Sequence, residues 1–460
     1  MRKTIRIGVV PVKRSFLPME AALEQKSKLF GVLSQIRADR IELVSIDSLV
    51  DCGIACDIGT VPAIVDYLQQ KKVDALFLPF CDFGEETVAA SVASALKLPT
   101  LVWGPRDEHP NTAQTRGRDT QCGIFAATKV LRRMNVKYSY IYNVPADSVE
   151  FAKGYLTFVR YANVIKDLNG LKIAKIGDRP GPFLSVQTNE AMLLTNLNIS
   201  VVPIGAAGII AAADAIIEKK ENDFNEYLAS LRKRFDVSAM SEDALEKCAA
   251  LKIAVGKAIA DTGASVAAFE CWSAFYAYGV IPCVILGDLA DEGIPLSCEC
   301  DINGAISQAI LRAANLYDES VFLADLTIRN PQNDNSELLW HCGPFPFSLK
   351  STGCAAALVS GQEQFMLKDG ELTLARFDDC GGKYYLFTGE CRTTTGPETM
   401  GTYTYIEVDD WKRWEEKLVF GPYIHHIGGV YGRYLPVLRE VARYLNLEFD
   451  NAHEQGTYSL

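Results

Sequence analysis

The sequence contains few histidines and no long hydrophobic run. Five histidines occur in 460 residues. No uncharged apolar stretch reaches the roughly 18 residues that a membrane-crossing helix needs. Residues 1–16 have neither a long apolar segment nor a cleavage site, so they are typical of a first β-strand rather than a secretory signal. We therefore expect a cytoplasmic protein that does not bind a membrane.

An excess of positive charge is also missing. The chain has 46 Lys and Arg against 57 Asp and Glu, which gives a formal net charge of -11. This balance disfavours general binding to nucleic acid or to anionic membranes, although clustered Arg and Lys could still bind a small anion. The length exceeds that of one typical domain, and two or three domains are expected.

Paired cysteine motifs are absent as well. The thirteen cysteines form no CxxC pair, and the spacing of a zinc site is missing. Because we expect a reducing compartment, we interpret most of them as small buried hydrophobic side chains rather than disulfides or metal ligands.

The first part of the chain alternates β-rich and helical segments. Expected strands lie at 4–12, 41–46, 74–80, 100–104 and 138–144, with helices near 19–36, 61–70, 85–96 and 123–133. A second block begins at 171 and repeats this order up to a strand at 265–270. The alternation predicts two doubly wound α/β domains with parallel sheets, whose ligands bind at the carboxyl ends of the strands.

After about residue 324 the pattern changes to β-rich runs separated by Gly, Asp and Asn turns, with a final helix at about 432–445. This pattern predicts a mainly β, antiparallel and barrel-like domain. The run "LKDGEL" at 367–372 has the Asp-Gly signature of a tight hairpin. We predict an N-terminal α/β domain at 1–168, a second α/β domain at 169–322 and a β-rich C-terminal domain at 323–460.

Three carboxylates are candidates for chemistry. Glu270 ends the apolar run "AAFECW", where its side chain would project into the crevice of an open sheet; a solvated strand end is the alternative. Glu299 and Asp301 in "IPLSCECDING" are two residues apart, so on a strand they would share one face. A cation or a shared proton would relieve their repulsion. The alternative is that Asp301 or Asn303 caps the helix expected at about 304–315.

Three histidines lie in turn-rich segments. His341 follows Trp340 beside a Gly-Pro turn, and His425 and His426 occur in "GPYIHHIGGVYG". A satisfied core histidine and a polar surface turn are the alternatives to metal ligands at these places. Carboxylates with one imidazole suit Mn²⁺, Mg²⁺ or Co²⁺ better than a thiolate-bound zinc. Such an ion can bind adjacent sugar oxygens and polarise a carbonyl, while the carboxylates move a proton between neighbouring carbons.

At these segments the chain resembles the L-fucose isomerase and L-arabinose isomerase superfamily, over essentially its whole length and in the same domain order. "IPLSCECDINGAISQAILRAANLYDESVFLADL", "FECW" and "HHIGGVYGRYLPVLREVARYLNLEF" are the most similar stretches. The resemblance implies that Glu270, Asp301 and His426 are metal ligands. It also implies that Glu270 and Asp301 transfer the proton through a cis-enediol.

The resemblance further implies substrate contacts and an assembly. His425 would orient or contact the substrate, and His341 takes about the place of an additional histidine ligand in arabinose isomerases, so it would be a ligand or a substrate contact. Trp272 and Trp340 could stack on the sugar. Family members form trimers and hexamers in which the N-terminal domain reaches a neighbour's site, and residues 114–123 are the segment expected there.

Three arginines, Arg116, Arg118 and Arg179, could bind an anionic substrate, with surface charge as the alternative. The sequence therefore predicts a metal-dependent aldose–ketose isomerase of a deoxy-, pentose or sulfonated sugar, sulfoquinovose included, that uses Mn²⁺ (or Mg²⁺ or Co²⁺). A non-catalytic cytoplasmic sugar-binding or regulatory protein is the alternative, because paired doubly wound domains also build proteins that close around sugars.

Overall fold

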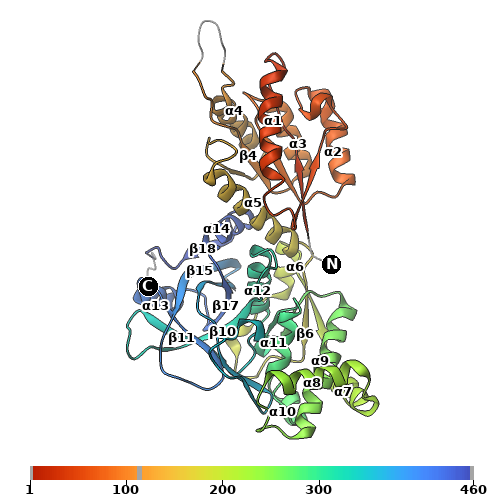
Figure 1. Ribbon diagram of the computed structural model, residues 1–460, viewed down its shortest axis with the longest axis vertical. Coiled ribbons are helices and arrows are strands. Elements are labelled where there is room, and N and C mark those ends of the chain that lie inside the picture. Colours follow the sequence, from red (N-terminus) through yellow and green to blue (C-terminus); the bar gives the residue numbers. More distant parts are fainter. Residues whose placement is uncertain (1–3, 111–116, 456–460) are drawn as a thin grey trace. The chain divides into compact units, whose positions relative to one another are not determined.

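The computed structural model describes residues 4–110 and 117–455. The chain divides into two compact units, Met1–Lys166 and Asp167–Leu460, and each is described by itself (Figure 1). In the described ranges, no helix combines the length and the apolar character that a bilayer crossing requires. The boundaries predicted near 168 and 322 stay a prediction.

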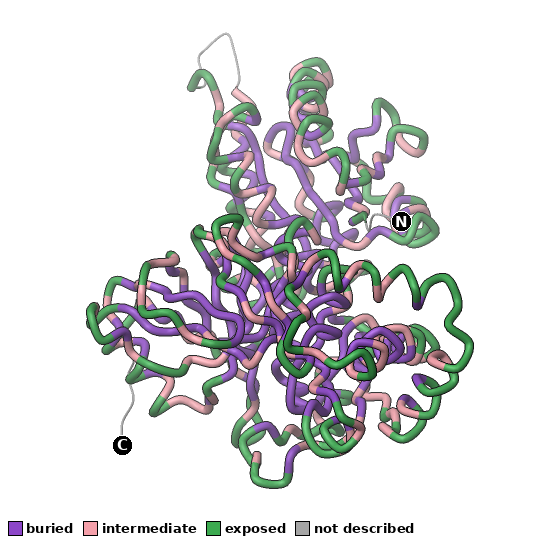
Figure 2. The backbone as a smooth tube through the Cα atoms, turned by 60° about the horizontal axis from the view of Figure 1, so that its bottom comes forward, coloured by how far each residue is buried: buried purple, intermediate pink, exposed green. Residues whose placement is uncertain are grey.

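The first unit contains a five-stranded parallel sheet in the order β2-β1-β3-β4-β5. The central strand β3 is buried at all five positions, because helices cover both faces of the sheet, and buried backbone runs through the interior of this unit in Figure 2. The strands are β1 (Ile5–Val9), β2 (Ile41–Ser45), β3 (Ala75–Pro79), β4 (Thr100–Trp103) and β5 (Tyr138–Tyr140), and the helices are α1 (Met19–Leu33), α2 (Val61–Gln70), α3 (Glu86–Leu96), α4 (Thr120–Arg133) and α5 (Val149–Leu168).

The second unit begins with a four-stranded parallel sheet in the order β7-β6-β8-β9. Its strands are β6 (Lys172–Ile176), β7 (Ser200–Ile204), β8 (Val266–Phe269) and β9 (Leu296–Ser297). The helices of this part are α6 (Glu190–Leu197), α7 (Ala206–Lys219), α8 (Asn222–Arg234), α9 (Glu242–Thr262), α10 (Ala274–Tyr278), α11 (Cys283–Asp291) and α12 (Ile302–Ala314). The prediction of two parallel-sheet α/β parts is confirmed.

A mainly antiparallel barrel follows, as predicted. Six strands form the ring β16-β11-β10-β17-β14-β15, which the pairing of β15 with β16 closes. They are β10 (Phe322–Arg329), β11 (Ser336–His341), β14 (Glu371–Cys380), β15 (Lys383–Thr394), β16 (Thr402–Glu407) and β17 (His426–Tyr431). Strands β12 (Ala357–Val359), β13 (Gln362–Met366) and β18 (Glu448–Asn451) extend the sheet, and α13 (Trp411–Phe420) and α14 (Leu435–Leu445) accompany it.

The tight hairpin predicted at "LKDGEL" is wrong. This segment joins β13 to β14, but β13 pairs with β12 and β16, whereas β14 pairs with β15 and β17. A tight hairpin lies at the other end of β14, where Cys380 faces Lys383 across a two-residue turn. Gly381 and Gly382 have φ of 58° and 80°, the left-handed region that a hairpin of this length needs.

Helix α12 positions the site, because it lies between the parallel sheet and the barrel (Figure 1). All its residues are buried, and it contacts β8 and β9 on one side and β14 and β17 on the other. The turn that leads into α12 therefore meets the beginning of β17. The carboxyl ends of the parallel strands and the barrel strands that carry the histidines converge at this point.

Candidate active site

His426 begins β17 and lies at the centre of a cluster of ionisable side chains. Its side chain is completely buried. Antiparallel pairing sets Asp325 of β10 directly opposite His426, so their side chains meet across the two strands. His341 ends β11, the other neighbour of β10. The barrel thus brings one carboxylate and two imidazoles together from three adjacent strands.

Glu299 and Asp301 approach His426 from the turn between β9 and α12. This turn, η4 (Cys298–Cys300), has two consecutive residues in the left-handed region, Glu299 at φ 60° and Cys300 at φ 54°. The expectation that the two carboxylates share one face holds for a strand and is wrong for this turn. Instead, Glu299 lies at Nε2 and Asp301 at Nδ1 of the same His426 ring. Backbone in such sparsely populated regions is enriched at functional sites.

The Nδ1 side of His426 is closely paired. Asp301 Oδ2 accepts a hydrogen bond from His426 Nδ1 at 2.8 Å, and Oδ1 accepts the backbone N–H of Gly304 at 2.9 Å, which caps α12. The Arg376 guanidinium donates to both oxygens of Asp301, and its Nε donates to Asp378 at 2.9 Å. Although burial opposes ionisation, Arg376 and His426 hold the pKa of Asp301 well below its ordinary value. Asp301 is therefore a buried anion that fixes the His426 ring.

On the Nε2 side of His426, two carboxylates lie within ion-pair distance, but no hydrogen bond is formed among the residues that the structure describes. In the described part of the chain, His426 Nε2, Glu299 Oε2 and Asp325 Oδ1 are buried atoms without a hydrogen-bond partner. Nε2 lies 3.1 Å from Oε2 and 3.6 Å from Oδ1. Ligand atoms at about 2.1 Å from an octahedral cation lie about 3 Å apart along each edge. Nε2 thus lies near one oxygen of each carboxylate, at spacings close to such an edge. Among the described residues, Asp325, His425 and His426 offer ligand atoms that all lie within 4.8 Å of one another.

The two buried histidines present different ring nitrogens. Because the Asp301 carboxylate accepts from His426 Nδ1, that nitrogen keeps its proton, and Nε2 is the nitrogen that can present a lone pair to a metal. Burial lowers the pKa of His426, but the neighbouring carboxylates of Asp301 and Glu299 raise it to about 9, so a bound cation would take the place of a proton on Nε2. His341 differs, because its Nδ1 accepts the N–H of Cys342 at 2.9 Å and its Nε2 then carries the proton. His341 therefore suits a hydrogen bond to substrate better than metal ligation.

A pocket of about 480 Å³ opens at this unpaired side. It contains both predicted aromatic contacts: Trp272 is 46% exposed, and Trp340 is held by a hydrogen bond from its Nε1 to the carbonyl of Met400 at 2.6 Å. A small number of polar groups between aromatic walls suits a small polar ligand such as a sugar. The lining residues include Glu299, Asp325, His341, Trp272, Tyr276, Trp340 and Gln362.

Glu270 lies at the end of β8, as predicted, but its carboxylate has other partners. Oε2 accepts the backbone N–H of Asp178 at 3.0 Å, and Oε1 accepts that of Ala274 at 3.2 Å. A Cβ on Gly177 would collide with Oε2 at 2.1 Å, so the loop after β6 is closely fitted to this side chain. These contacts indicate that Glu270 ties the carboxyl end of β6 to the beginning of α10. Its predicted role as a metal ligand stays a prediction.

The predicted anion-binding arginines that the structure describes, Arg118 and Arg179, have partners within their own units. Arg118 of the first unit donates to the Glu108 carboxylate at 2.6 Å, and Arg179 of the second unit donates to the carbonyls of Pro180 and Gly181. Arg116 lies outside the described residues, as do residues 114 and 115 of the segment that we expect near a neighbouring subunit. Among the described residues that line the pocket, none is Lys or Arg.

His425, by contrast, lies beside the cluster. It is exposed, and its ring centroid is 4.4 Å from that of His426. Partial desolvation and the neighbouring His426 lower the pKa of His425, so its imidazole favours the neutral form. This position is compatible with the predicted substrate contact.

Sequence reasoning did not assign roles to Glu299 and Asp325, which contribute the unpaired oxygens. The only sequence signal at Glu299 is its spacing from Asp301, and the left-handed backbone at Glu299 sends the two side chains to different nitrogens of His426. Asp325 gave one signal, its place near the end of an apolar strand, "FLADL". The pairing of that strand with β17 makes Asp325 the partner of His426, and this pairing is not readable from local sequence.

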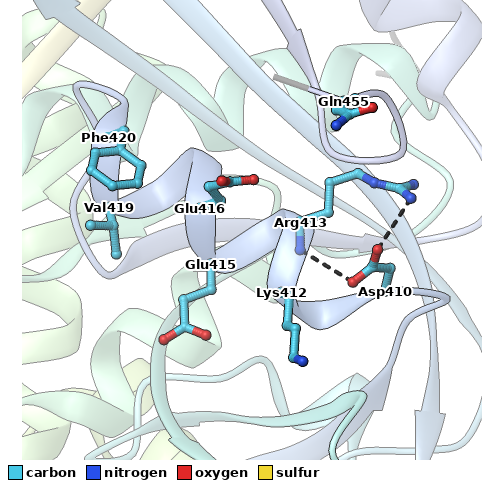
Figure 3. Close-up of a pocket in the computed structure, with 8 residues that line it drawn as sticks. All are labelled: Asp410, Lys412, Arg413, Glu415, Glu416, Val419, Phe420 and Gln455. Carbon is cyan, nitrogen blue, oxygen red and sulfur yellow. Dashed lines mark hydrogen bonds and ion pairs between the residues drawn. The ribbon is translucent and has the colours of Figure 1, made fainter. Parts of the chain in front are cut away.

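A second hollow, of about 460 Å³, lies along α13 and is drawn in Figure 3. Asp410 caps this helix by accepting the backbone N–H of Arg413 and also pairs with its guanidinium. The other residues that line the hollow are charged or apolar side chains on the surface of α13, together with Gln455. These contacts stabilise the beginning of the helix, and we assign no chemistry to them.

Comparison with known proteins gives matches along the whole chain. Residues 8–169 match the family model described as "Fucose/sulfoquinovose isomerase, N-terminal domain". A sulfoquinovose isomerase of Priestia aryabhattai is 26% identical over 95% of this chain and 97% of its own length, and one from Priestia megaterium gives the same values. A sulfoquinovose isomerase of Alkalicoccus urumqiensis is 24% identical over 69% of this chain and 72% of its own length.

Proposed function

We propose that this chain, which belongs to the fucose isomerase-like superfamily and is a sugar isomerase of the aldose–ketose class, uses the cluster around His426 as its active site. The observation that carries the proposal is the convergence of the unpaired Glu299 and Asp325 oxygens on His426 Nε2. Buried polar atoms without partners are uncommon in proteins and need a ligand or a water to satisfy them.

We assign the metal ligands to Glu299, Asp325 and His426. Two carboxylates and one imidazole form a donor set that suits Mn²⁺, Mg²⁺ or Co²⁺, and we propose Mn²⁺. When bound, such a cation polarises the substrate carbonyl and stabilises negative charge on adjacent sugar oxygens. Asp301 holds His426 in the ligating tautomer but has no oxygen free for the cation, and Glu270 holds the neighbouring loop.

We assign the proton transfer to the same two carboxylates. Glu299 and Asp325 both line the pocket. One of them accepts the proton from C2 of the open-chain sugar, and the other returns a proton at C1 through an enediol. His341 donates its Nε2 proton to a substrate oxygen, and the aromatic walls at Trp272 and Trp340 exclude water and orient the carbon chain.

We propose sulfoquinovose as the substrate to test first. All the relatives named above are described as sulfoquinovose isomerases, and two of them align over nearly the full length of the chain. Because the described lining of the pocket has no cationic side chain, the group that binds the sulfonate must come from outside that lining. Arg116 and the predicted trimer or hexamer, in which a neighbour's N-terminal domain reaches the site, remain predictions, as does the cytoplasmic location.

Proton NMR in deuterated water tests the activity directly. The Mn²⁺-loaded protein is mixed with sulfoquinovose, and the experiment follows loss of the C2 proton signal and appearance of the ketose. Glucose, which carries a hydroxyl where sulfoquinovose has its sulfonate, is the matched control, and L-fucose, L-arabinose and D-arabinose complete the panel. We expect exchange with sulfoquinovose that EDTA abolishes. Absence of exchange with every sugar, in protein shown to hold Mn²⁺, would contradict the proposal.

A further inference from the structure

Four thiols meet beside the pocket. Cys271 follows β8, Cys283 begins α11, Cys298 begins η4 and Cys342 follows β11. The Sγ atoms of Cys271 and Cys298 are 2.9 Å apart, and those of Cys283 and Cys342 are 3.5 Å apart. Cys298 and Cys342 also contact each other, so the two pairs form one continuous row. Residues far apart in sequence thus place four sulfur atoms within reach of their neighbours.

Two thiols of this row reach the pocket. Cys271 and Cys342 line the pocket, whereas Cys283 does not. Cys342 is partly exposed, and the other three thiols are buried. A small molecule that enters the pocket therefore reaches Cys342 first. The three buried thiols are protected from direct attack but lie close enough to react with a modified neighbour.

We propose that this row is an oxidation site for hydroperoxides, in which Cys342 reacts first and then forms a disulfide with Cys283. In the first step the peroxide O–O bond breaks, one oxygen bonds to Cys342 Sγ to give a sulfenic acid, and an alcohol or water leaves. In the second step Cys283 Sγ attacks the Cys342 sulfur, the S–O bond breaks and water leaves. The two thiols together lose two electrons, which reduce the peroxide.

The disulfide would act on the neighbouring active site through His341. Closing the gap from 3.5 Å to an S–S bond moves the sulfurs together by about 1.5 Å. Cys342 holds the His341 ring by two contacts. Its backbone N–H donates to His341 Nδ1, and its sulfur lies 3.3 Å from the same nitrogen. A shift there misplaces the His341 proton, and we expect activity to fall by about 10–100-fold, as when a supporting contact of a metal site is removed.

Peptide mapping by mass spectrometry tests the site. The full-length protein is titrated with hydrogen peroxide, free thiols are alkylated, and the digest is searched for linked peptides. We expect a Cys283–Cys342 pair at peroxide doses that leave the buried Cys248 and Cys391 reduced, and dithiothreitol should remove it and restore activity. The linked pair is a readout that does not depend on the isomerase assignment.

Two variants sharpen this test. Cys283→Ser should keep basal activity and lose the linked pair, whereas Cys380→Ser, which removes an exposed thiol, should behave as the wild type. The proposal is overturned if Cys342 stays reduced at doses that oxidise Cys380. It is equally overturned if Cys342 pairs with Cys298 in place of Cys283, or accumulates as sulfinic acid in the wild type without a linked peptide.

Discussion

The two sides of the His426 ring differ in how their polar groups are paired. On the Nδ1 side, Asp301 and Arg376 are fully buried and share charged hydrogen bonds. On the Nε2 side, Glu299 and Asp325 have buried oxygens without a hydrogen-bond partner in the described chain. The Nδ1 side, which we call the closed side, fixes the ring and its tautomer. The Nε2 side, which we call the open side, leaves electron pairs available for a ligand.

This difference argues that a buried carboxylate next to a histidine need not be a metal ligand. Asp301 is closer to His426 than Glu299 is, at 2.8 Å against 3.1 Å. Its oxygens are nevertheless occupied by Arg376, by Gly304 and by the ring itself. We therefore propose the metal site from the unpaired atoms rather than from the shortest distance.

The largest effect should come from the open side. Glu299→Gln exchanges a carboxylate, which can bind a cation and accept a proton, for a neutral amide. We therefore expect kcat/KM to fall by about 10²–10⁴-fold. The fold should remain, because Glu299 Oε2 makes no hydrogen bond within the described chain. Turnover of sulfoquinovose and circular dichroism check the two parts. Full activity in this variant would exclude Glu299 from the site.

A smaller effect, on Mn²⁺ affinity, should come from a change on the closed side. Asp301→Asn weakens the hold on His426, so Mn²⁺ affinity should fall by about 10–100-fold. Because Arg376 loses one of two carboxylate partners, the free energy of unfolding should also fall, by about 3 kcal/mol. Isothermal titration and urea unfolding measure these quantities.

Asp378→Asn is the matched control, since it removes the other partner of Arg376 without touching His426. It should reduce stability but leave Mn²⁺ affinity near that of the wild type. Equal losses of affinity in Asp301→Asn and Asp378→Asn would mean that the effect arises from Arg376 rather than from the tautomer of His426.

Acid should remove the contribution of Asp301 to the stability of the folded protein. The pKa of Asp301 is lowered in the folded protein from an ordinary value of 3.8. A lowered carboxyl pKa adds stability that is present above the unfolded pKa and is lost as pH falls through the folded pKa. The stability difference between wild type and Asp301→Asn should thus be largest at about pH 5 to 6 and narrow below about pH 4. It should also narrow above about pH 6.5, because Asp301 raises the pKa of His426 and the stability from that pair is lost as the ring deprotonates. Thermal unfolding of the metal-free proteins across this range measures it; a difference that widens in acid would contradict the pairing.

The smallest effect on the cation should follow Glu270→Gln. The Glu270 oxygens accept backbone N–H groups from Asp178 and Ala274, and the amide oxygen can replace only part of this. We expect about 1 kcal/mol less stability and a change in Mn²⁺ affinity below about threefold, as for independent sites. Calorimetry checks both, and a large loss of affinity would restore Glu270 as a ligand.

The sequence predicted the fold well because its signals are local. Alternating strands and helices identify parallel sheets, and the change to β-rich runs after residue 324 identifies the barrel. The Asp-Gly hairpin failed because a turn signature states that the chain turns, not which strands pair. The neighbours of β13 and β14 are fixed by barrel closure, which involves residues far apart in sequence.

The site was predicted in part for the same reason. His426 and the pocket residues Trp272, Trp340 and His341 lie in segments with recognisable local patterns. Two left-handed residues in η4 decide that Glu299 rather than Asp301 faces Nε2 of His426. The register of β10 against β17 decides that Asp325 lies opposite His426. Neither property follows from residue spacing. The sequence therefore indicates segments that contain candidate carboxylates but does not indicate which of these carboxylates faces His426 Nε2.

The measurement that tests this account most directly is an anomalous diffraction map from crystals grown with Mn²⁺. We predict a single manganese peak in the pocket, bonded to His426 Nε2 and to the carboxylates of Glu299 and Asp325, with Asp301 still at Nδ1. A manganese peak bonded to Glu270 or to Asp301 instead would contradict the assignment of the open side as the metal site.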